Sequence, residues 1–164
     1  ILSAFALPRF ADLSGNAEIA AMEGAYASAK STSAIVHASA LANGATAATG
    51  NIIMEGANFA TVNGYPDAGG ILGATGVDAA NGFGISEAAN LDDYTKVYLN
   101  TGDFNSTTAA LADQIVSVSV LVTAEPTTLG NPCFIYTEAA SSTTAPTFTA
   151  ISSLGGTLAA LTCP

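Results

Sequence analysis

Residues 1–20 read ILSAFALPRFADLSGNAEIA, and this stretch decides the fold. An apolar run from Ile1 to Leu7 meets Pro8, and the chain then continues in residues that favour helix. A proline inside a helix costs about 3 kcal/mol and kinks the helix. A helix that starts at Pro8 would leave the seven preceding residues unexplained. An ordinary helix that crosses a domain therefore accounts for residues 17–43 but not for residues 1–10.

Residues 1–43 are predicted to form one long helix. No further proline occurs between Pro8 and Asn43, and Ala, the residue with the highest helix propensity, recurs densely. At about 1.5 Å per residue such a helix spans roughly 65 Å, which is longer than a domain of this size is wide. We therefore expect residues 1–16 to protrude and residues 17–43 to pack on the rest of the chain. Asn43-Gly44 marks the expected end of the helix.

The composition indicates one folded domain with an acidic surface. The chain has 164 residues, of which 49% are hydrophobic and 10% charged, so it is long and apolar enough to build a core. Three Lys and Arg residues stand against thirteen Asp and Glu residues, for a net charge of −10. This balance argues against binding to nucleic acid or to anionic lipid by the isolated chain.

Two cysteines, Cys133 and Cys163, both lie in the last third of the chain. An even pair indicates a disulfide and an oxidising compartment. Closing a loop of about 30 residues would stabilise the fold by roughly 3.5 kcal/mol. The alternative is two buried free thiols. No CxxC motif or Cys/His cluster supports zinc or covalently attached haem.

The remaining chain divides into a glycine-rich part and a part rich in strand-forming residues. Ten of the sixteen glycines lie between Gly44 and Gly84, so we expect residues 44–93 to be a loop without regular helix or strand. Residues 94–164 are predicted to form strands at 96–99, 115–123, 133–137, 147–151 and 157–161. In the second of these, the valines at 116, 118, 120 and 122 alternate, and we expect them to face the helix. A helix followed by an antiparallel sheet is an α+β fold.

No residue pattern predicts catalysis or a cofactor. His37 is the only histidine, and the chain has neither a nucleophile elbow nor a phosphate-binding glycine motif. Asp78, Glu87, Asp92 and Asp93 could hold calcium, but their spacing matches no EF-hand, and they fit solvated loop acids better. We therefore expect no catalytic residue, no cofactor and no metal.

Two exposed-looking segments are candidates for glycosylation. Asn105 begins an N-x-[ST] acceptor motif, and residues 141–144 form a hydroxyl cluster that could carry O-linked sugar. Such motifs recur by chance, and unmodified surface loops are the alternative.

Two segments resemble the type IV pilins, and in particular the mannose-sensitive haemagglutinin group of type IVa-like major pilins. The first is the apolar segment that leads through ALPRF at residues 6–10 into a long helix, and the second is VNGYP at residues 62–66. The resemblance implies the pilin ladle fold, in which residues 44–93 are the αβ-loop and a disulfide brackets the C-terminal D-region of residues 94–164. It also implies a missing N-terminal segment with an early glutamate, which would anchor the chain in the inner membrane before assembly.

The resemblance further implies a structural role without catalysis. The chain would polymerise through its helix into an extracellular filament on a bacterial surface, with the help of the pilus assembly machinery, for adhesion, surface attachment or motility. Identical subunits would be its partners, and seven residues would pack in the filament core: Ile1, Leu2, Phe5, Leu7, Pro8, Phe10 and Leu13. The alternatives are a pseudopilin of a type II secretion system, which often carries calcium in place of a disulfide, and a soluble secreted adhesin or glycan-binding domain.

Overall fold

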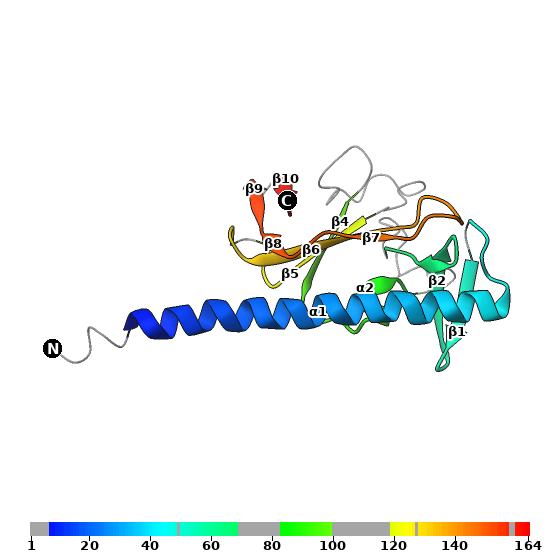
Figure 1. Ribbon diagram of the computed structural model, residues 1–164, viewed down its shortest axis with the longest axis horizontal. Coiled ribbons are helices and arrows are strands. Elements are labelled where there is room, and N and C mark those ends of the chain that lie inside the picture. Colours follow the sequence, from blue (N-terminus) through cyan, green and yellow to red (C-terminus); the bar gives the residue numbers. More distant parts are fainter. Residues whose placement is uncertain (1–6, 49, 69–82, 100–118, 127, 158–159) are drawn as a thin grey trace, which may run out of the picture.

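The computed structural model describes residues 7–48, 50–68, 83–99, 119–126, 128–157 and 160–164, and it leaves out the side chains of residues 7–14, 157 and 160. One long helix lies along two antiparallel sheets (Figure 1). The α+β class expected from the sequence is confirmed at this level.

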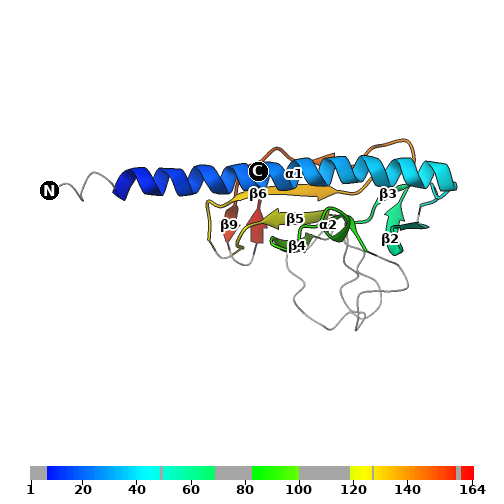
Figure 2. The same ribbon diagram turned by 90° about the horizontal axis from the view of Figure 1, so that it is seen from below.

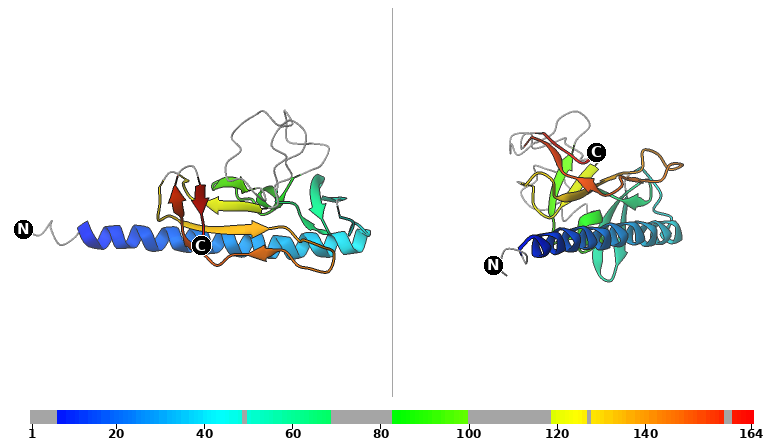
Figure 3. Two further views of the ribbon diagram at one scale, coloured as in Figure 1. Left: turned by 90° about the horizontal axis from the view of Figure 1, so that it is seen from above. Right: turned by 60° about the vertical axis from the view of Figure 1, so that its left-hand side comes forward.

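Helix α1 runs from Leu7 to Asn43 and has 37 residues. Its N-terminal part extends beyond the sheets, which lie on one side of its C-terminal part (Figure 3). The helix ends where the sequence predicts, because Gly44 adopts a φ of +67° that glycine tolerates best. The Ala45 N–H then donates to the Ala40 carbonyl at 2.8 Å, as in the usual left-handed helix cap. Residues 1–6, the start of the expected helix, lie outside the described residues.

A small sheet follows α1, which corrects the expectation that residues 44–93 lack regular structure. Strands β1 (Gly50–Met54), β2 (Ala57–Val62) and β3 (Tyr65–Pro66) form a three-stranded antiparallel sheet. Gly56 and Gly64 do not mark an irregular loop. They lie in the two-residue turns between the strands, at φ of +82° and +81°. Each follows a residue that also has positive φ, as hairpin turns of this kind require. A short helix, α2 (Ile85–Ala88), lies later in the same part of the chain.

The larger sheet contains five strands. Four follow one another in the order β4 (Thr95–Leu99), β5 (Ser119–Thr123), β6 (Pro132–Thr137) and β7 (Thr147–Phe148), and the fifth, β8 (Ser152–Ser153), also pairs with β6. The predicted strands at 96–99 and 133–137 are confirmed, as is the described part of 115–123. The strand predicted at 147–151 is shorter than expected. Its pairing changes at Thr149, whose Oγ1 accepts the Ile135 N–H at 2.8 Å in place of a backbone carbonyl.

The C-terminal residues form a hairpin instead of the predicted single strand at 157–161. Strands β9 (Gly155–Thr157) and β10 (Ala160–Thr162) pair with each other, and Thr157 lies opposite Ala160. The sequence between these two residues contains no Gly, Pro, Asn or Asp that would mark a reversal. The turn therefore could not be read from residue type.

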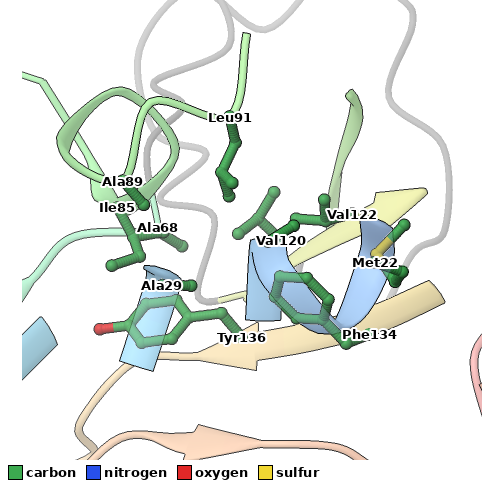
Figure 4. Packing of buried hydrophobic residues seen from close by; sticks show 11 residues of the cluster. Met22, Ala29, Ala68, Ile85, Ala89, Leu91, Val120, Val122, Phe134 and Tyr136 are labelled. Carbon is green, nitrogen blue, oxygen red and sulfur yellow. The ribbon is translucent and has the colours of Figure 1, made fainter. Parts of the chain in front are cut away.

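The main core lies between α1 and the larger sheet (Figure 2). One row of α1 is buried at helical spacing, and its members are Met22, Ala25, Ala29, Ser33, Val36 and Ala40. Val120 and Val122 pack with Phe134 and Tyr136 against Met22, Ala25 and Ala29 of this row (Figure 4), so the predicted valine face is confirmed for the described part of its strand. Val36 and Ala40 pack instead with Ile52 of the small sheet. Leu121, which points to the other side of the sheet, belongs to a second cluster around the disulfide.

Candidate assembly surface

The side of α1 that faces away from the sheets is exposed along its whole described length. All residues from Gly15 to Ala21 are exposed, and Met22 is the first buried one among the described side chains of α1. Three large apolar side chains on the helix face solvent, because Ile19, Ile35 and Leu41 are 47%, 61% and 58% exposed. The described chain therefore buries only one side of α1.

Small residues make up most of this exposed surface. Residues of the outward strip recur every three or four positions, and they are Ala20, Gly24, Ala27, Ser31, Ala34 and Ala38. Helix axes can approach most closely where the side chains at the contact are small. Lys30 at the border of the strip lies over the Tyr26 ring, 4.9 Å from its centroid, so its charge is held toward the sheet side. The strip is thus suited to contact with another helix.

The seven residues expected to pack in a filament core all lie in the first fourteen residues of the chain. The backbone of Leu7, Pro8, Phe10 and Leu13 is helical, whereas their side chains and residues 1–6 lie outside the described residues. The exposed side of α1 is therefore described from residues 15–43.

The predicted disulfide is present. Cys133 on β6 is bonded to Cys163 just after β10, with their Cα atoms 6.0 Å apart. Both sulfurs are buried in the second cluster, among Leu99, Leu121 and Leu154. The bond holds the C-terminal hairpin against the larger sheet, and the alternative of two free thiols is excluded.

His37 joins α1 to the small sheet. Its Nδ1 lies 3.0 Å from the Gly64 carbonyl oxygen, and its ring stacks on Tyr65 with the centroids 3.8 Å apart and the planes 2° from parallel. Because a carbonyl only accepts, Nδ1 must carry the proton. These contacts give His37 a structural role at the turn between β2 and β3.

Two of the acidic residues considered for calcium have separate partners. The Glu87 Oε2 accepts the Gly84 N–H at 3.1 Å, and Asp92 pairs with Lys96 at 3.3 Å. Asp78 and the glycosylation candidate Asn105 lie outside the described residues. Within the part of the chain that the structure describes, no group of three or more His, Cys, Asp or Glu side chains could hold a metal ion.

Sequence reasoning missed a buried carboxyl group. Glu138 follows β6, is 8% exposed, and accepts the Ala68 N–H at 2.8 Å. Burial raises the pKa of Glu138 to about 8; the Ala68 N–H opposes this rise, and the neighbouring Asp67 carboxyl adds to it. The alternation of β6 could have revealed the position, because Phe134, Tyr136 and Glu138 fall on one face.

Tyr136 is the second buried polar group at this place. Its hydroxyl donates to the Pro66 carbonyl oxygen at 2.5 Å, and burial raises the pKa of Tyr136 far above its ordinary value. Through Pro66 and Ala68, the two side chains connect the end of β6 to the end of β3 and the residues just after it.

Among the helices of the described chain, none combines the length and the apolar character that a membrane crossing needs. Comparison of the whole chain with models of protein families, with curated proteins and with solved structures found no match in any of the three.

Proposed function

We propose that this chain is a structural subunit of a type IV pilus with the ladle form of the pilin fold. Subunits would assemble through α1 into a filament outside the cell, on the bacterial surface. In this proposal no residue has a catalytic role. The resemblance of residues 6–10 and 62–66 to the haemagglutinin group of pilins supports it, and so does a disulfide, which is typical of an oxidising compartment.

One observation carries the proposal, namely that α1 has far more surface than its own domain covers. An isolated helix of ordinary length is marginally stable in water, and most helices depend on packing of an apolar face. Residues 15–21 of α1 have no buried member, and the outward strip continues the exposed surface to Ala38. Exposed apolar surface of this extent marks an interaction site. Copies of the same helix are the occupants that the small residues fit best.

The outer surface of such a filament would be formed by the sheets and their turns. The turn at residues 141–144 is exposed at most positions, and its hydroxyls bond one another, with Ser141 Oγ and Thr144 Oγ1 2.9 Å apart. We assign adhesive contact or attached sugar to this side of the subunit. The exposed side of α1 would then face inward.

An Ala→Glu pair of variants tests the role of α1. Ala34 lies in the outward strip, and Ala145 lies in a turn after β6; both are exposed. We expect Ala34→Glu to abolish filaments while the domain stays folded, because a carboxylate cannot be buried between closely packed helices. Ala145→Glu adds the same charge elsewhere and should leave filaments intact. Electron microscopy of sheared cell-surface material and circular dichroism of the purified chain provide the two readouts. Normal filaments from Ala34→Glu would contradict the proposal.

The native N-terminus separates the proposal from its alternatives. Mass spectrometry of protein from the source cells should find an N-methylated first residue, an apolar segment with an early glutamate, and then Ile1. Phe10→Glu in that protein should also block assembly. A native chain that follows a conventional cleaved signal peptide would favour the soluble adhesin. Short periplasmic assemblies in place of surface filaments would favour the pseudopilin.

A further inference from the structure

One flank of α1 carries two opposite charges beside the outward strip. Glu23 and Lys30 are both exposed, and they lie seven residues apart. Seven residues make almost two full turns of an α-helix, so the two side chains leave the helix on nearly the same side, about 10 Å apart along its axis. In the part of the chain that the structure describes, the one ion pair joins Lys96 to Asp92. Within that part, Glu23 and Lys30 therefore form no ion pair.

The other flank of the outward strip carries no charge. By helical spacing, its members on the described part of α1 are Ala17, Ala21, Ser28, Ile35 and Ala42. All five are uncharged, and four of them are exposed. The charges beside the strip thus lie on one flank only, and this asymmetry limits how two copies of the helix can meet.

The asymmetry distinguishes parallel from antiparallel pairing of two copies. In a twofold pair of parallel helices, the two different flanks lie side by side, whereas in an antiparallel pair each flank lies beside the same flank of the other copy. A parallel pair would therefore place Glu23 and Lys30 against uncharged side chains. An antiparallel pair can place Glu23 of each copy beside Lys30 of the other, so that all four charges are paired.

We propose that two copies of this chain pair antiparallel through the outward strip, with Glu23 of each copy beside Lys30 of the other. The twofold axis then passes close to Ala27, which faces the same residue of the other copy. Ala20 of one copy lies level with Ala34 of the other. Small side chains at these three positions allow the two helix axes to approach closely.

Two further features of the described chain suit this pairing. Ile19, which is 47% exposed, lies on the charged flank and would be level with Ala34 of the other copy, so the pair covers an exposed apolar side chain. The Lys30 ammonium lies 4.9 Å from the centroid of the Tyr26 ring and 5.9 Å from that of Phe148, which holds it at the border of the strip. An ammonium has three N–H donors, so Lys30 can still donate to a carboxylate there.

The rest of the molecule leaves room for the second helix. The sheets lie on one side of α1 (Figure 3), and the outward strip lies on the other. The inference needs only the exposed side of α1, so it goes beyond the filament proposal and does not fail with it. If the chain also forms filaments, the pair covers the same strip and competes with their assembly.

Sedimentation equilibrium of the purified, disulfide-intact chain tests the pairing, at about 0.15 M salt so that the net charge of −10 is screened. Glu23→Lys places two pairs of like charges across the interface, so it should weaken the dimer about tenfold or more, as should Lys30→Glu. The double variant Glu23→Lys/Lys30→Glu restores opposite charges and should recover the wild-type dissociation constant. Glu55→Lys, at an exposed position in the turn after β1, is the matched control and should not weaken the dimer.

Single introduced cysteines test the orientation of the two helices. Both native cysteines are in the disulfide, so an added cysteine is the one free thiol of the chain. In a mixture in which one variant carries ¹⁵N, a short thiol crosslinker should join Ala20→Cys to Ala34→Cys and should link neither variant to itself. Mass spectrometry identifies the linked pairs.

Three results would overturn the proposal, once circular dichroism has established that the variants are folded. The first is a wild-type chain that stays monomeric up to about 1 mM, the dissociation constant of a weak complex. The second is crosslinking of Ala20→Cys to itself, which a parallel pair in register would give. The third is a double charge variant that pairs as weakly as the single ones. These measurements use the purified chain, so their failure is distinct from a failure to find filaments on cells.

Discussion

At the scale of single residues, the buried hydroxyl of Tyr136 provides the simplest test of the junction between the two sheets. Tyr136 is 0% exposed, and its hydroxyl bonds the Pro66 carbonyl. Tyr136→Phe leaves that carbonyl buried without its donor, so we expect a loss of about 1–3 kcal/mol in the free energy of unfolding. Urea unfolding followed by circular dichroism measures the change.

Tyr94→Phe is the matched control for this variant. The Tyr94 hydroxyl also donates to a backbone carbonyl, that of Ala21 at 3.0 Å, but at an exposed place. Water can replace the lost donor there, so the expected loss is below about 1 kcal/mol. Equal losses for the two variants would show that the buried Tyr136 hydrogen bond contributes no more to the free energy of unfolding than the exposed Tyr94 bond.

Two glycines in equivalent turns separate backbone strain from crowding. Gly56 and Gly64 have φ of +82° and +81°, so a change to Ala strains both by roughly 1 kcal/mol. A Cβ at Gly64 would lie 3.3 Å from Thr46 Cγ2 and 3.5 Å from His37 Nδ1, whereas a Cβ at Gly56 would meet nothing within 4 Å. We expect Gly64→Ala to lower the melting temperature more than Gly56→Ala. The reverse order would argue against close packing at the turn beside His37.

At the scale of elements, the disulfide determines how firmly the C-terminal hairpin is held. The bond spans 30 residues of sequence, and its removal should cost about 3.5 kcal/mol through the added freedom of the unfolded chain. For a chain of this length that corresponds to a fall of about 7–14 °C in melting temperature. Calorimetry of Cys133→Ser/Cys163→Ser beside the oxidised wild type measures the difference. A fall of less than 2–3 °C would show that the hairpin is held by its packing alone.

The elements that sequence reasoning predicted correctly are those with strong local signals. Alanine density and the Asn43-Gly44 end predict α1, and the alternating valines predict the strand whose described part is β5. The small sheet was not predicted, because glycine marks positions where the backbone adopts positive φ. Such positions occur in tight hairpin turns as well as in irregular loops. The hairpin of β9 and β10 was missed because its reversal carries no turn residue.

The candidate site was predictable only in part, for a similar reason. The length of α1 and its small residues are visible in the sequence, so a protruding, multiply packed helix could be expected. The hydrogen bond from the Ala68 N–H to the Glu138 carboxyl joins residues 70 positions apart, and no local pattern predicts such a contact. Only the alternation of β6, continued by one residue to Glu138, indicates that this side chain points inward.

At the scale of the whole molecule, the net charge of −10 should make self-association depend on salt. Like-charged subunits repel one another, and the screening length falls from about 30 Å at 0.01 M salt to about 10 Å at 0.1 M. If the chain forms filaments as proposed, the sedimentable fraction should increase over this range. Glu55→Gln/Asp93→Asn, which removes two exposed charges, should need less salt for the same fraction. Sedimentation that is independent of salt would show that charge repulsion does not limit assembly.

The bond between Cys133 and Cys163 also limits how far the chain can be stretched. A fully extended residue adds about 3.3–3.6 Å to the contour of a chain, so the 30 residues between the two sulfurs would contribute roughly 100 Å if they were free. A force that pulls on the two ends of the chain is carried through the Cys133–Cys163 bond, and it bypasses the residues between the two cysteines. Strands β7 to β10 then carry none of the tension, even after the rest of the domain has been drawn out. The turn at residues 141–144, which we propose for the outer surface, thereby lies in the part of the subunit that mechanical load cannot unravel.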